Sequence, residues 1–450
     1  MTSSTRRTRA VALAAALLVA AAGLATAPTA VAHGSGGHGA SHGHGTGHGK
    51  GHGDHGKGHH DRWDAELGGI YVDPQSSTVE HAEELTGQAR KDALRLARIP
   101  SATWFTDGTP REVRRDAADL VERADKADAV PVLVAYNIPY RDCSLYSAGG
   151  AADGEAYARW IEGLAAGIGK REAIVVLEPD GLGVIPWHED INGNPESCQP
   201  EELDPDTAAD QRFEQLSHAV DVLSALPRTK VYLDGTGSSW LSPGDATVRL
   251  TKANVAKADG FFINVSNYES DDRLAHYASW VSDCLALTTR SSFPATSCQS
   301  QYYPATFGDT STWGLTDAAY DQAFADQGLE RDVATQKHAV LDTSRNGQGS
   351  WAAPEGKYTD AEVWCNPPDR GLGQLPDLDV DDPYVDARLW IKVPGESDGE
   401  CFRGTGGPLD PERGMQDPPA GAWFPEQARE LIELANPALP ADDGCRGRRH

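Results

Sequence analysis

The sequence has little positive charge and no recognisable zinc-binding pattern. It contains 40 Lys and Arg against 67 Asp and Glu, which gives a formal net charge of −27 at pH 7. A surface this acidic repels nucleic acid and anionic lipid and suits a neutral ligand. The seven cysteines form no Cys-x-x-Cys or Cys-x-x-His pair, and such pairs are typical of zinc sites. We therefore expect no nucleic-acid partner, no membrane partner, no metal and no cofactor.

Long apolar runs are also lacking, except near the start. Residues 10–27 are apolar, follow three arginines and precede the small residues 30–32. This pattern predicts a signal peptide over residues 1–32, and hence a secreted protein. A retained membrane anchor is the alternative, but the run is short for a bilayer and no second stretch of ~20 apolar residues follows. Loss of the three arginines changes the net charge from −27 to −30.

Residues 33–60 consist mostly of His and Gly and hold nine of the fifteen histidines. Such a tract offers nothing to bury, so we predict a disordered leader. Two uses remain open for it. It is either a flexible linker or a weak binder of Zn, Cu or Ni through neutral imidazoles.

The remaining 390 residues, 61–450, suit one large α/β barrel or two ordinary domains. We expect a single domain. Export permits disulfides, and three bridges with one thiol left over is the simplest arrangement. The cysteines are Cys143, Cys198, Cys284, Cys298, Cys365, Cys401 and Cys445.

Short apolar runs alternate with longer amphipathic ones through this region. The apolar runs predict parallel strands that are buried on both faces. Between them, the spacing of apolar residues predicts helices over residues 155–170 and 210–226. Repeated strand–helix units imply a β/α barrel or a doubly wound sheet. The predicted strands are residues 69–72, 132–136, 174–178, 231–234, 261–264, 339–342 and 389–393.

The residues that end these runs favour the barrel. Almost every run ends in, or is followed by, a polar side chain, as at Tyr136, Asp180 and Asp234. Functional groups gathered from the C-terminal ends of many strands are typical of a β/α barrel. No Gly-x-Gly-x-x-Gly follows a predicted strand, so a dinucleotide fold loses support. Long loops rich in Pro, Gly, Ser and Asp are expected around the mouth, at residues 190–206, 282–314, 349–382 and 402–422.

A candidate general acid lies in the segment VVLEPDGLG (175–183). An apolar strand leads to Asp180, Pro179 stiffens the turn, and Gly181 permits a sharp bend. A carboxyl group against apolar surroundings favours its protonated form, which a general acid needs. The alternative is a structural Asp180 that caps a following helix.

A second strand leads into AYNIPYRDC (135–143). If Asp142 lies near Asp180, repulsion between like charges keeps one of the two protonated. The alternative pairs Asp142 with Arg141 in a salt bridge within the loop.

A third cluster follows the last predicted strand, in WIKVPGESDGEC (390–401). Asp398 is placed to orient water, while Lys392 and Glu396 are placed to bond hydroxyl groups of a ligand. A solvated acidic loop is the alternative.

Taken together, the three segments resemble glycoside hydrolase family 6, the secreted cellulases. The likeness extends from about residue 70 to residue 437 and includes IPSATW (99–104), NVSNY (264–268), DTSRNGQG (342–349) and WCNPP (364–368). It implies an α/β fold, a distorted β/α barrel with about seven parallel strands. It also implies inversion at the anomeric carbon and a β-1,4-glucan, cellulose or a relative of it, as the substrate.

The resemblance assigns roles residue by residue. Asp180 matches the catalytic acid, and Asp142 matches the Asp that keeps this acid protonated and helps to draw a proton from water. Asp398 matches the proposed base. Tyr136 matches the tyrosine beneath the distorted sugar ring. One departure concerns Asp234, because the family reads Asp-Ala-Gly-His where this chain has DGTG (234–237); the lost His puts the sugar contact near Asp234 in question.

The resemblance also implies two disulfides, Cys143–Cys198 and Cys365–Cys401. We add Cys284–Cys298 because these two cysteines are close in one loop.

In the expected reaction, Asp180 protonates the leaving oxygen while water attacks the opposite face of the sugar ring. Room for that water requires about 6.5–9.5 Å between Asp180 and Asp398. If the proton of this water is instead relayed to Asp142, the distance between Asp180 and Asp398 is less diagnostic of the mechanism. Tryptophans are expected to stack on glucose faces, with packing in the core as the alternative for each. The expected substrate contacts are Tyr136, Trp104, Asp234, Trp240, Asn267, Trp364, Lys392 and Glu396.

Two other functional classes stay open. A non-catalytic glycan-binding protein keeps the tryptophans but tolerates loss of the acid. A metal-dependent hydrolase is disfavoured, because the few histidines after residue 60 form no His-x-His or His-x-x-x-His pair. Endo and exo action also stay open. The stretch 399–420 is longer than an open, endo-type cleft needs, and its closure over the substrate would indicate exo action. Polymer viscosity measured against reducing ends separates the two modes. We expect a monomer.

Overall fold

The computed structural model describes residues 66, 67 and 69–440. The predicted signal peptide, the His/Gly-rich tract and Cys445 lie outside these residues. Within them, none of the helices is both long and apolar enough to cross a bilayer.

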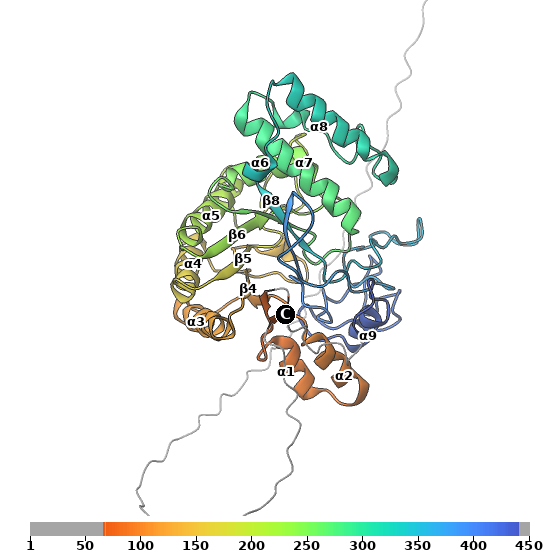
Figure 1. The fold of residues 1–450 in the computed structure, drawn as a ribbon. Helices are drawn as coiled ribbons and strands as arrows, with labels where there is room; N and C mark the ends of the chain where they lie inside the picture. Colours follow the sequence, from red (N-terminus) through yellow and green to blue (C-terminus); the bar gives the residue numbers. More distant parts are fainter. Residues whose placement is uncertain (1–65, 68, 441–450) are drawn as a thin grey trace, which may run out of the picture. The chain divides into compact units, whose positions relative to one another are not determined.

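Seven parallel strands form one curled sheet, and their order in the sheet follows their order in the chain (Figure 1). This is the distorted α/β barrel that the sequence predicts. The strands are β3 (Thr103–Phe105), β4 (Val132–Ala135), β5 (Ala173–Leu177), β6 (Thr229–Asp234), β7 (Gly260–Ile263), β8 (His338–Asp342) and β9 (Val385–Leu389).

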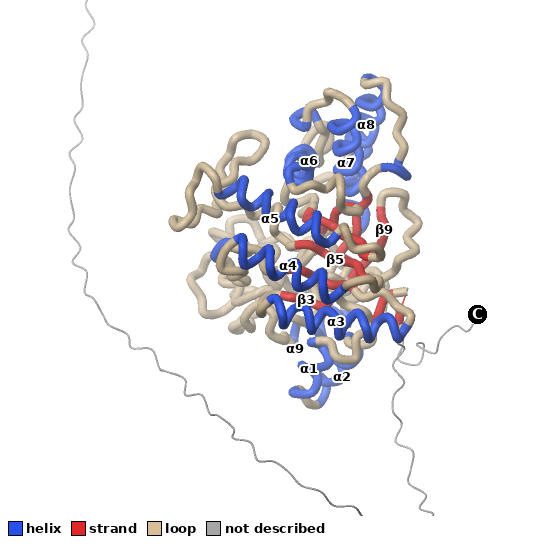
Figure 2. The backbone as a smooth tube through the Cα atoms, turned by 90° about the vertical axis from the view of Figure 1, so that its left-hand side faces the viewer, coloured by secondary structure: helices blue, strands red, loops and turns tan. Residues whose placement is uncertain are grey.

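Helices connect these strands and cover the outside of the sheet. Figure 2 shows α3, α4 and α5 side by side, and Figure 1 shows them along one side of the barrel. The helices are α1 (Ser77–Glu84), α2 (Gly87–Leu96), α3 (Pro110–Ala127), α4 (Gly154–Ile168), α5 (Ala208–Leu223), α6 (Pro243–Lys252), α7 (Asp271–Arg290), α8 (Gly314–Asp326) and α9 (Pro425–Glu433). The short 3-10 segments are η1 (Asp142–Ser144), η2 (Ala295–Ser297), η3 (Thr310–Thr312) and η4 (Val333–Thr335).

The core has two parts, because successive strand residues point to opposite faces of the sheet. In β4, Val132 and Val134 pack inside the barrel with Ile174 and Val176 of β5. Leu133 and the residues that alternate with the others face the helices. Burial on both faces explains why β5 reads AIVVL without a polar residue.

Two of the predicted strands are wrong at the edges of the sheet. Residues 69–72 contain β2 (Ile70–Tyr71), which pairs antiparallel with β1 (Glu66–Leu67) and meets the main sheet only through an isolated parallel bridge to Val130, just before β4. Of the predicted strand at residues 389–393, only Leu389 belongs to β9, and the other four residues follow it. As an edge strand, β9 alternates buried and half-buried residues, so its sequence VDARL lacks the apolar run.

The missed edge strand is β3, which is only three residues long. Ala102 N donates to Trp390 O at 2.9 Å, so the segments beside β3 and β9 meet. The loop expected at 282–314 also starts too early, since α7 continues to Arg290 and Cys284 lies within it.

Candidate active site

Asp180 lies in a tight turn directly after β5. Glu178 and Asp180 both have left-handed backbone conformations, with φ of 53° and 62°. A Cβ on Gly181 would lie 2.6 Å from the carbonyl oxygen of Glu178, so glycine is required there. The turn therefore holds Asp180 in a strained backbone conformation at the C-terminal end of the strand.

The side chain of Tyr136 contacts Asp180, and that of Trp104 packs against Tyr136. Tyr136, directly after β4, donates its hydroxyl to Asp180 Oδ2 at 3.4 Å. Trp104 of β3 contacts the Tyr136 ring edge-on, with centroids 5.2 Å apart. Its indole Nε1 donates to Ile391 O at 2.8 Å. Three strand ends thus bring the predicted acid together with two of the expected substrate contacts.

Asp142 lies at the start of η1, in the loop after β4. Its Oδ2 accepts a hydrogen bond from Ser147 N at 2.7 Å. Arg141 donates to Thr106 O at 2.8 Å and to Ser147 O at 3.0 Å instead of forming the salt bridge considered for Asp142. The disulfide between the adjacent Cys143 and Cys198 anchors the loop.

The two carboxyl groups have different electrostatic environments. Burial, and then the charges of Asp142 and Asp234, hold the pKa of Asp180 well above its usual range. Burial raises the pKa of Asp142 to about 6, against the opposing effects of the Ser147 hydrogen bond and Arg141. The two shifts favour a protonated Asp180 beside an Asp142 that ionises near pH 6, which is the division of states that acid catalysis needs.

Asp234 supports the Asp180 turn. Its Oδ2 accepts hydrogen bonds from Leu182 N and Gly183 N, both at 3.2 Å, and its Oδ1 accepts one from Thr236 N at 2.8 Å. The side chain is only 4% exposed. These bonds favour a positioning role for Asp234 over the sugar contact expected from the sequence.

Asp398 is a carboxylate with several strong partners. Its Oδ2 accepts from Arg345 at 2.8 Å, from the Tyr268 hydroxyl at 3.1 Å and from Asn366 N at 3.0 Å. Lys392 Nζ lies 3.4 Å from Oδ1. Burial raises the pKa of Asp398, but Arg345 and Lys392 outweigh it and place the pKa below its usual range. Asp398 therefore remains ionised.

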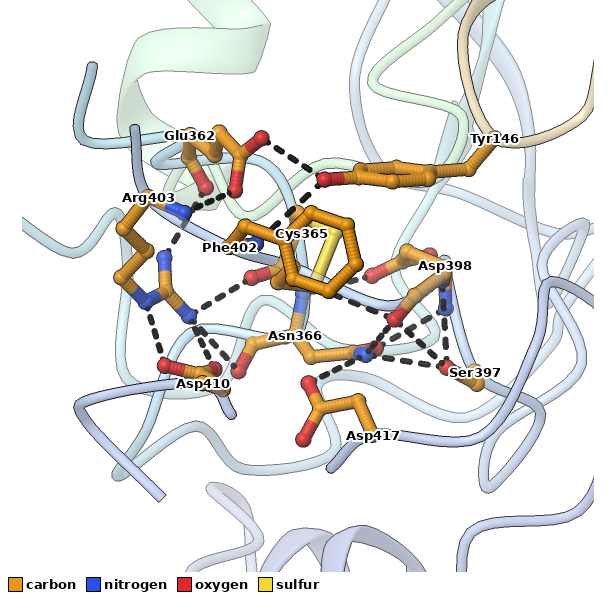
Figure 3. The surroundings of a disulfide bond; sticks show 12 residues. Tyr146, Glu362, Cys365, Asn366, Ser397, Asp398, Phe402, Arg403, Asp410 and Asp417 are labelled. Atoms are coloured by element: carbon orange, nitrogen blue, oxygen red, sulfur yellow. Dashed lines mark hydrogen bonds and ion pairs between the residues drawn. A yellow bond between two sulfur atoms is a disulfide. The ribbon is translucent and has the colours of Figure 1, made fainter. Parts of the chain in front are cut away.

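Asn366 connects the surroundings of Asp398 (Figure 3). Its side-chain oxygen accepts from Asp398 N at 2.9 Å, and its Nδ2 donates to Gly399 O and to Asp417 Oδ2, both at 2.9 Å. The adjacent disulfide Cys365–Cys401 fixes the same two segments. The loop after β9 is thereby locked around Asp398.

The nearby group of Cys401, Asp410 and Asp417 has the spacing of a metal site. In this structure the Cys401 sulfur is bonded to Cys365. Asp410 is fully buried and pairs with Arg403 through two hydrogen bonds of 2.8 Å. These bonds account for two of the three members, so we assign no metal here.

The loops that carry Asp142 and Asp398 pack against each other. Tyr146, four residues after Asp142, accepts a hydrogen bond from Phe402 N at 3.3 Å and donates to Glu362 at 2.8 Å (Figure 3). A Cβ on Gly399 would lie 2.4 Å from the Cβ of Tyr146. This contact brings the second and third predicted clusters to the same side of the barrel.

The other predicted contacts differ in their surroundings. Trp240 is 40% exposed, and a Cβ on Gly183 would lie 2.5 Å from its ring, so the indole lies over the Asp180 turn. Trp364 is half-buried, with its ring 5.9 Å from that of Tyr146. Asn267 is half-buried and donates to Val265 O at 3.2 Å.

Lys392 and Glu396 have partners within the protein. Lys392 is 8% exposed and donates to Ser397 O at 3.1 Å. Glu396 accepts from the Ser77 hydroxyl at 2.6 Å, which ties it to α1. The structure therefore does not gather these two side chains with Tyr136 and Asp180 through any direct contact among the described residues.

Several positioning residues were not recognised in the sequence. Arg345, Tyr268 and Asn366 stood inside motifs that supported the family resemblance but received no roles. Arg212 is the clearest omission. It lies on the apolar face of α5 and is 2% exposed. The signal available in the sequence was a charged residue next to Phe213, within the stretch whose apolar residues recur at helical spacing.

Arg212 joins the two loops that carry Asp180 and Asp142 through backbone carbonyls. It donates to Gly181 O at 3.0 Å and Val184 O at 2.9 Å in the Asp180 turn. It also donates to Pro139 O at 2.8 Å in the loop that leads to Asp142. One guanidinium thus spans both segments, which suits its planar fork of donors.

Comparisons with known proteins agree on one family. The model described as "Glycosyl hydrolases family 6" matches residues 68–435. Endoglucanase 1 from Streptomyces halstedii is 32% identical over 368 residues, which cover 81% of this chain and 88% of that protein. Endoglucanase A from Thermobispora bispora is 30% identical over 350 residues, or 77% of this chain, and this chain spans 61% of its length.

Solved structures share the fold. An endoglucanase from Mycobacterium tuberculosis, 30% identical, superposes with a TM-score of 0.59, covering 83% of this chain and 99% of that one. Cellobiohydrolase II from Humicola insolens, 20% identical, gives a TM-score of 0.56 over 84% of this chain and 99% of that one. The chain belongs to glycosyl hydrolases family 6.

Proposed function

We propose that this protein is an inverting hydrolase of β-1,4-glucosidic bonds in cellulose or a related glucan, with Asp180 as its general acid. The observation that carries the proposal is the environment of Asp180, whose pKa is raised by burial and by the nearby Asp142. The names of the relatives support the substrate class. The M. tuberculosis endoglucanase was solved with methyl cellobiosyl-4-deoxy-4-thio-β-D-cellobioside.

In the proposed reaction, Asp180 gives its proton to the glycosidic oxygen as the bond to the anomeric carbon breaks. Water attacks the opposite face of an oxocarbenium-like sugar, so that the configuration inverts. Tyr136 lies beside Asp180, and Trp104 packs against Tyr136, so that the two rings supply aromatic surfaces next to the reacting sugar.

We assign the proton from this water to Asp142, through a relay, rather than to Asp398. A general base works best with a pKa near the working pH, and the pKa of Asp142 is raised to about 6. Asp398 is instead committed to Arg345 and three further partners, with a lowered pKa. Its fixed negative charge stabilises the positive sugar in the transition state.

The test compares the wild type with Asp180→Ala on a soluble β-1,4-glucan. The wild type should release reducing sugar, and the first product seen by proton NMR should be the α-anomer. Removal of a general acid should lower the rate by about 10²- to 10⁴-fold. Equal rates for the two proteins would support a non-catalytic glycan-binding protein, and an initial β-anomer would contradict inversion.

We also propose that the protein is secreted. The predicted signal peptide supports this, and so do the three disulfides among the described residues, because such bonds persist in oxidising compartments. Mass spectrometry of protein from the culture medium should find a chain that starts at His33.

A further inference from the structure

Two neighbouring tyrosines between α7 and α8 are largely exposed. Tyr303 is 76% exposed and Tyr302 is 52% exposed. Single exposed aromatic residues are common on protein surfaces and need no explanation. Two adjacent exposed aromatic residues in a firmly held segment do need an explanation.

The segment that carries them is fixed from several sides. The disulfide Cys284–Cys298 ties its start to α7. Ser300 O accepts a hydrogen bond from the Thr316 hydroxyl of α8 at 2.9 Å, and Ser300 N donates to Tyr303 O at 2.9 Å. The exposure of the two rings is therefore a property of a well-packed loop.

The Tyr302 ring is supported on one face. It stacks on Phe307, with centroids 5.3 Å apart and an interplanar angle of 21°. The guanidinium of Arg273 lies 4.7 Å from the Phe307 ring. Since one face of Tyr302 packs and half of the side chain is exposed, the other face is available to a ligand.

A chain of contacts links this loop to the catalytic turn. Gln301 is fully buried, and its Nε2 donates to Ser238 O at 2.8 Å and to Leu241 O at 3.0 Å. These carbonyls flank the exposed Trp240, whose indole lies over Gly183 in the Asp180 turn. The loop that carries the two exposed tyrosines is thus bonded to the segment that carries Trp240.

We propose that Tyr302 and Tyr303 form an outer glucan-binding subsite that continues the Trp240 side of the cleft. Aromatic faces suit the apolar CH surfaces of glucose, and an uncharged polymer is not repelled by an acidic protein. The ligand is a β-1,4-glucan long enough to pass Trp240. This inference rests on the proposed function for the identity of its ligand.

The experiment measures binding and turnover separately. Gel retardation in hydroxyethyl cellulose, with Asp180→Ala present in each protein compared, reports binding without turnover, and KM is measured with active protein on that polymer and on a short chromogenic cellotrioside. The double variant Tyr302→Ala/Tyr303→Ala should be retarded less than its parent and should raise the polymer KM by about two- to tenfold. Its kcat and KM on the cellotrioside should equal those of the wild type.

Two matched controls separate ring stacking from other effects. Tyr302→Phe/Tyr303→Phe keeps both rings and should behave as the wild type. Leu315→Ala removes another exposed apolar side chain, 54% exposed, from the adjacent α8, and it should also leave both readouts unchanged.

Several outcomes would overturn the subsite. The first is unchanged retardation and polymer KM in the alanine variant, and the second is an equal loss of activity on both substrates. The third is an alanine variant that elutes as a smaller species than the wild type in gel filtration with no change in KM, which would indicate that the tyrosines serve self-association. Absence of hydrolysis by the wild type, with the difference in retardation retained, would contradict the proposed function and leave the subsite in place.

Discussion

Asp180 and Asp398 both follow strands of the barrel, and the charge of Asp398 is felt at Asp180. Their surroundings are nevertheless opposite. Asp180 has one long hydrogen bond, from Tyr136 at 3.4 Å. Asp398 accepts three bonds of 2.8–3.1 Å and is in ion pairs with Arg345 and Lys392. The same side-chain type is therefore held in two protonation states.

This difference predicts that Asp398 contributes mainly to stability and Asp180 mainly to catalysis. Burial without a cation makes ionisation of Asp180 costly, so the folded protein keeps its proton. Asp398 is bound to a fully buried arginine, so its charge is required by the fold. Substitution of each by the neutral amide should separate the two roles.

The largest effect on stability is expected for Asp398→Asn. This change leaves the buried Arg345 without its anion and should lower the free energy of unfolding by about 3–5 kcal/mol. Asp180→Asn should leave this free energy unchanged at pH 7 within about 0.5 kcal/mol, because it removes no ion pair. Urea unfolding of both variants measures the difference.

Asp417→Asn is the matched control for Asp398→Asn, because Asp417 belongs to the same Asn366 cluster (Figure 3). Burial raises the pKa of Asp417 to about 7, so a neutral amide should cost little. The effect of pH on stability has the sign expected for a carboxyl group with a lowered pKa. Because the pKa of Asp398 is lowered, its stabilisation exists above the unfolded pKa of about 3.9 and is lost as pH falls through the folded value. Equal losses in all three variants at pH 7 would contradict the comparison.

The next effect is a pH dependence that originates at Asp142. As pH falls through about 6, Asp142 gains a proton, so kcat/KM should fall by up to about tenfold per pH unit. In Asp142→Asn this acid limb should disappear. The alkaline limb should move to lower pH, because the charge of Asp142 contributes to the raised pKa of Asp180.

Profiles of kcat/KM between pH 4 and 9 for wild type and Asp142→Asn measure both limbs. Asp381→Asn changes an exposed carboxylate in the loop before β9 and should leave the profile unchanged. An acid limb that persists in Asp142→Asn would assign it to another group.

The fold was predictable where strands are buried on both faces. The runs around β4 to β8 are apolar because both faces pack. At the edges this signal fails: β9 alternates because it is half-buried, and β3 is too short to form a run. The apolar run after β9 belongs to backbone that leaves the sheet, where Lys392 N donates to Asp342 Oδ2 at 3.0 Å.

Candidate site residues could be picked out where a residue and its strand end are close in the chain. Asp180, Asp142 and Tyr136 each follow a buried strand within a few residues. Interactions across the chain gave no such signal. Arg345 and Asp398 are 53 positions apart, so the ion pair that lowers the pKa of Asp398 follows from the packing of separate loops.

The smallest effect is expected for substitution of Arg212. This residue holds the Asp180 turn through backbone carbonyls, whereas Arg345 binds the side chain of Asp398 directly. In Arg212→Lys the charge near Glu178 is kept, but an ammonium cannot reach both loops as the planar fork does. Unpaired carbonyls should lower the free energy of unfolding by about 1–3 kcal/mol. Misplacement of the acid should lower kcat by about two- to tenfold with little change in KM. If KM rises instead while kcat is kept, Arg212 shapes substrate binding and does not position Asp180 relative to Asp142.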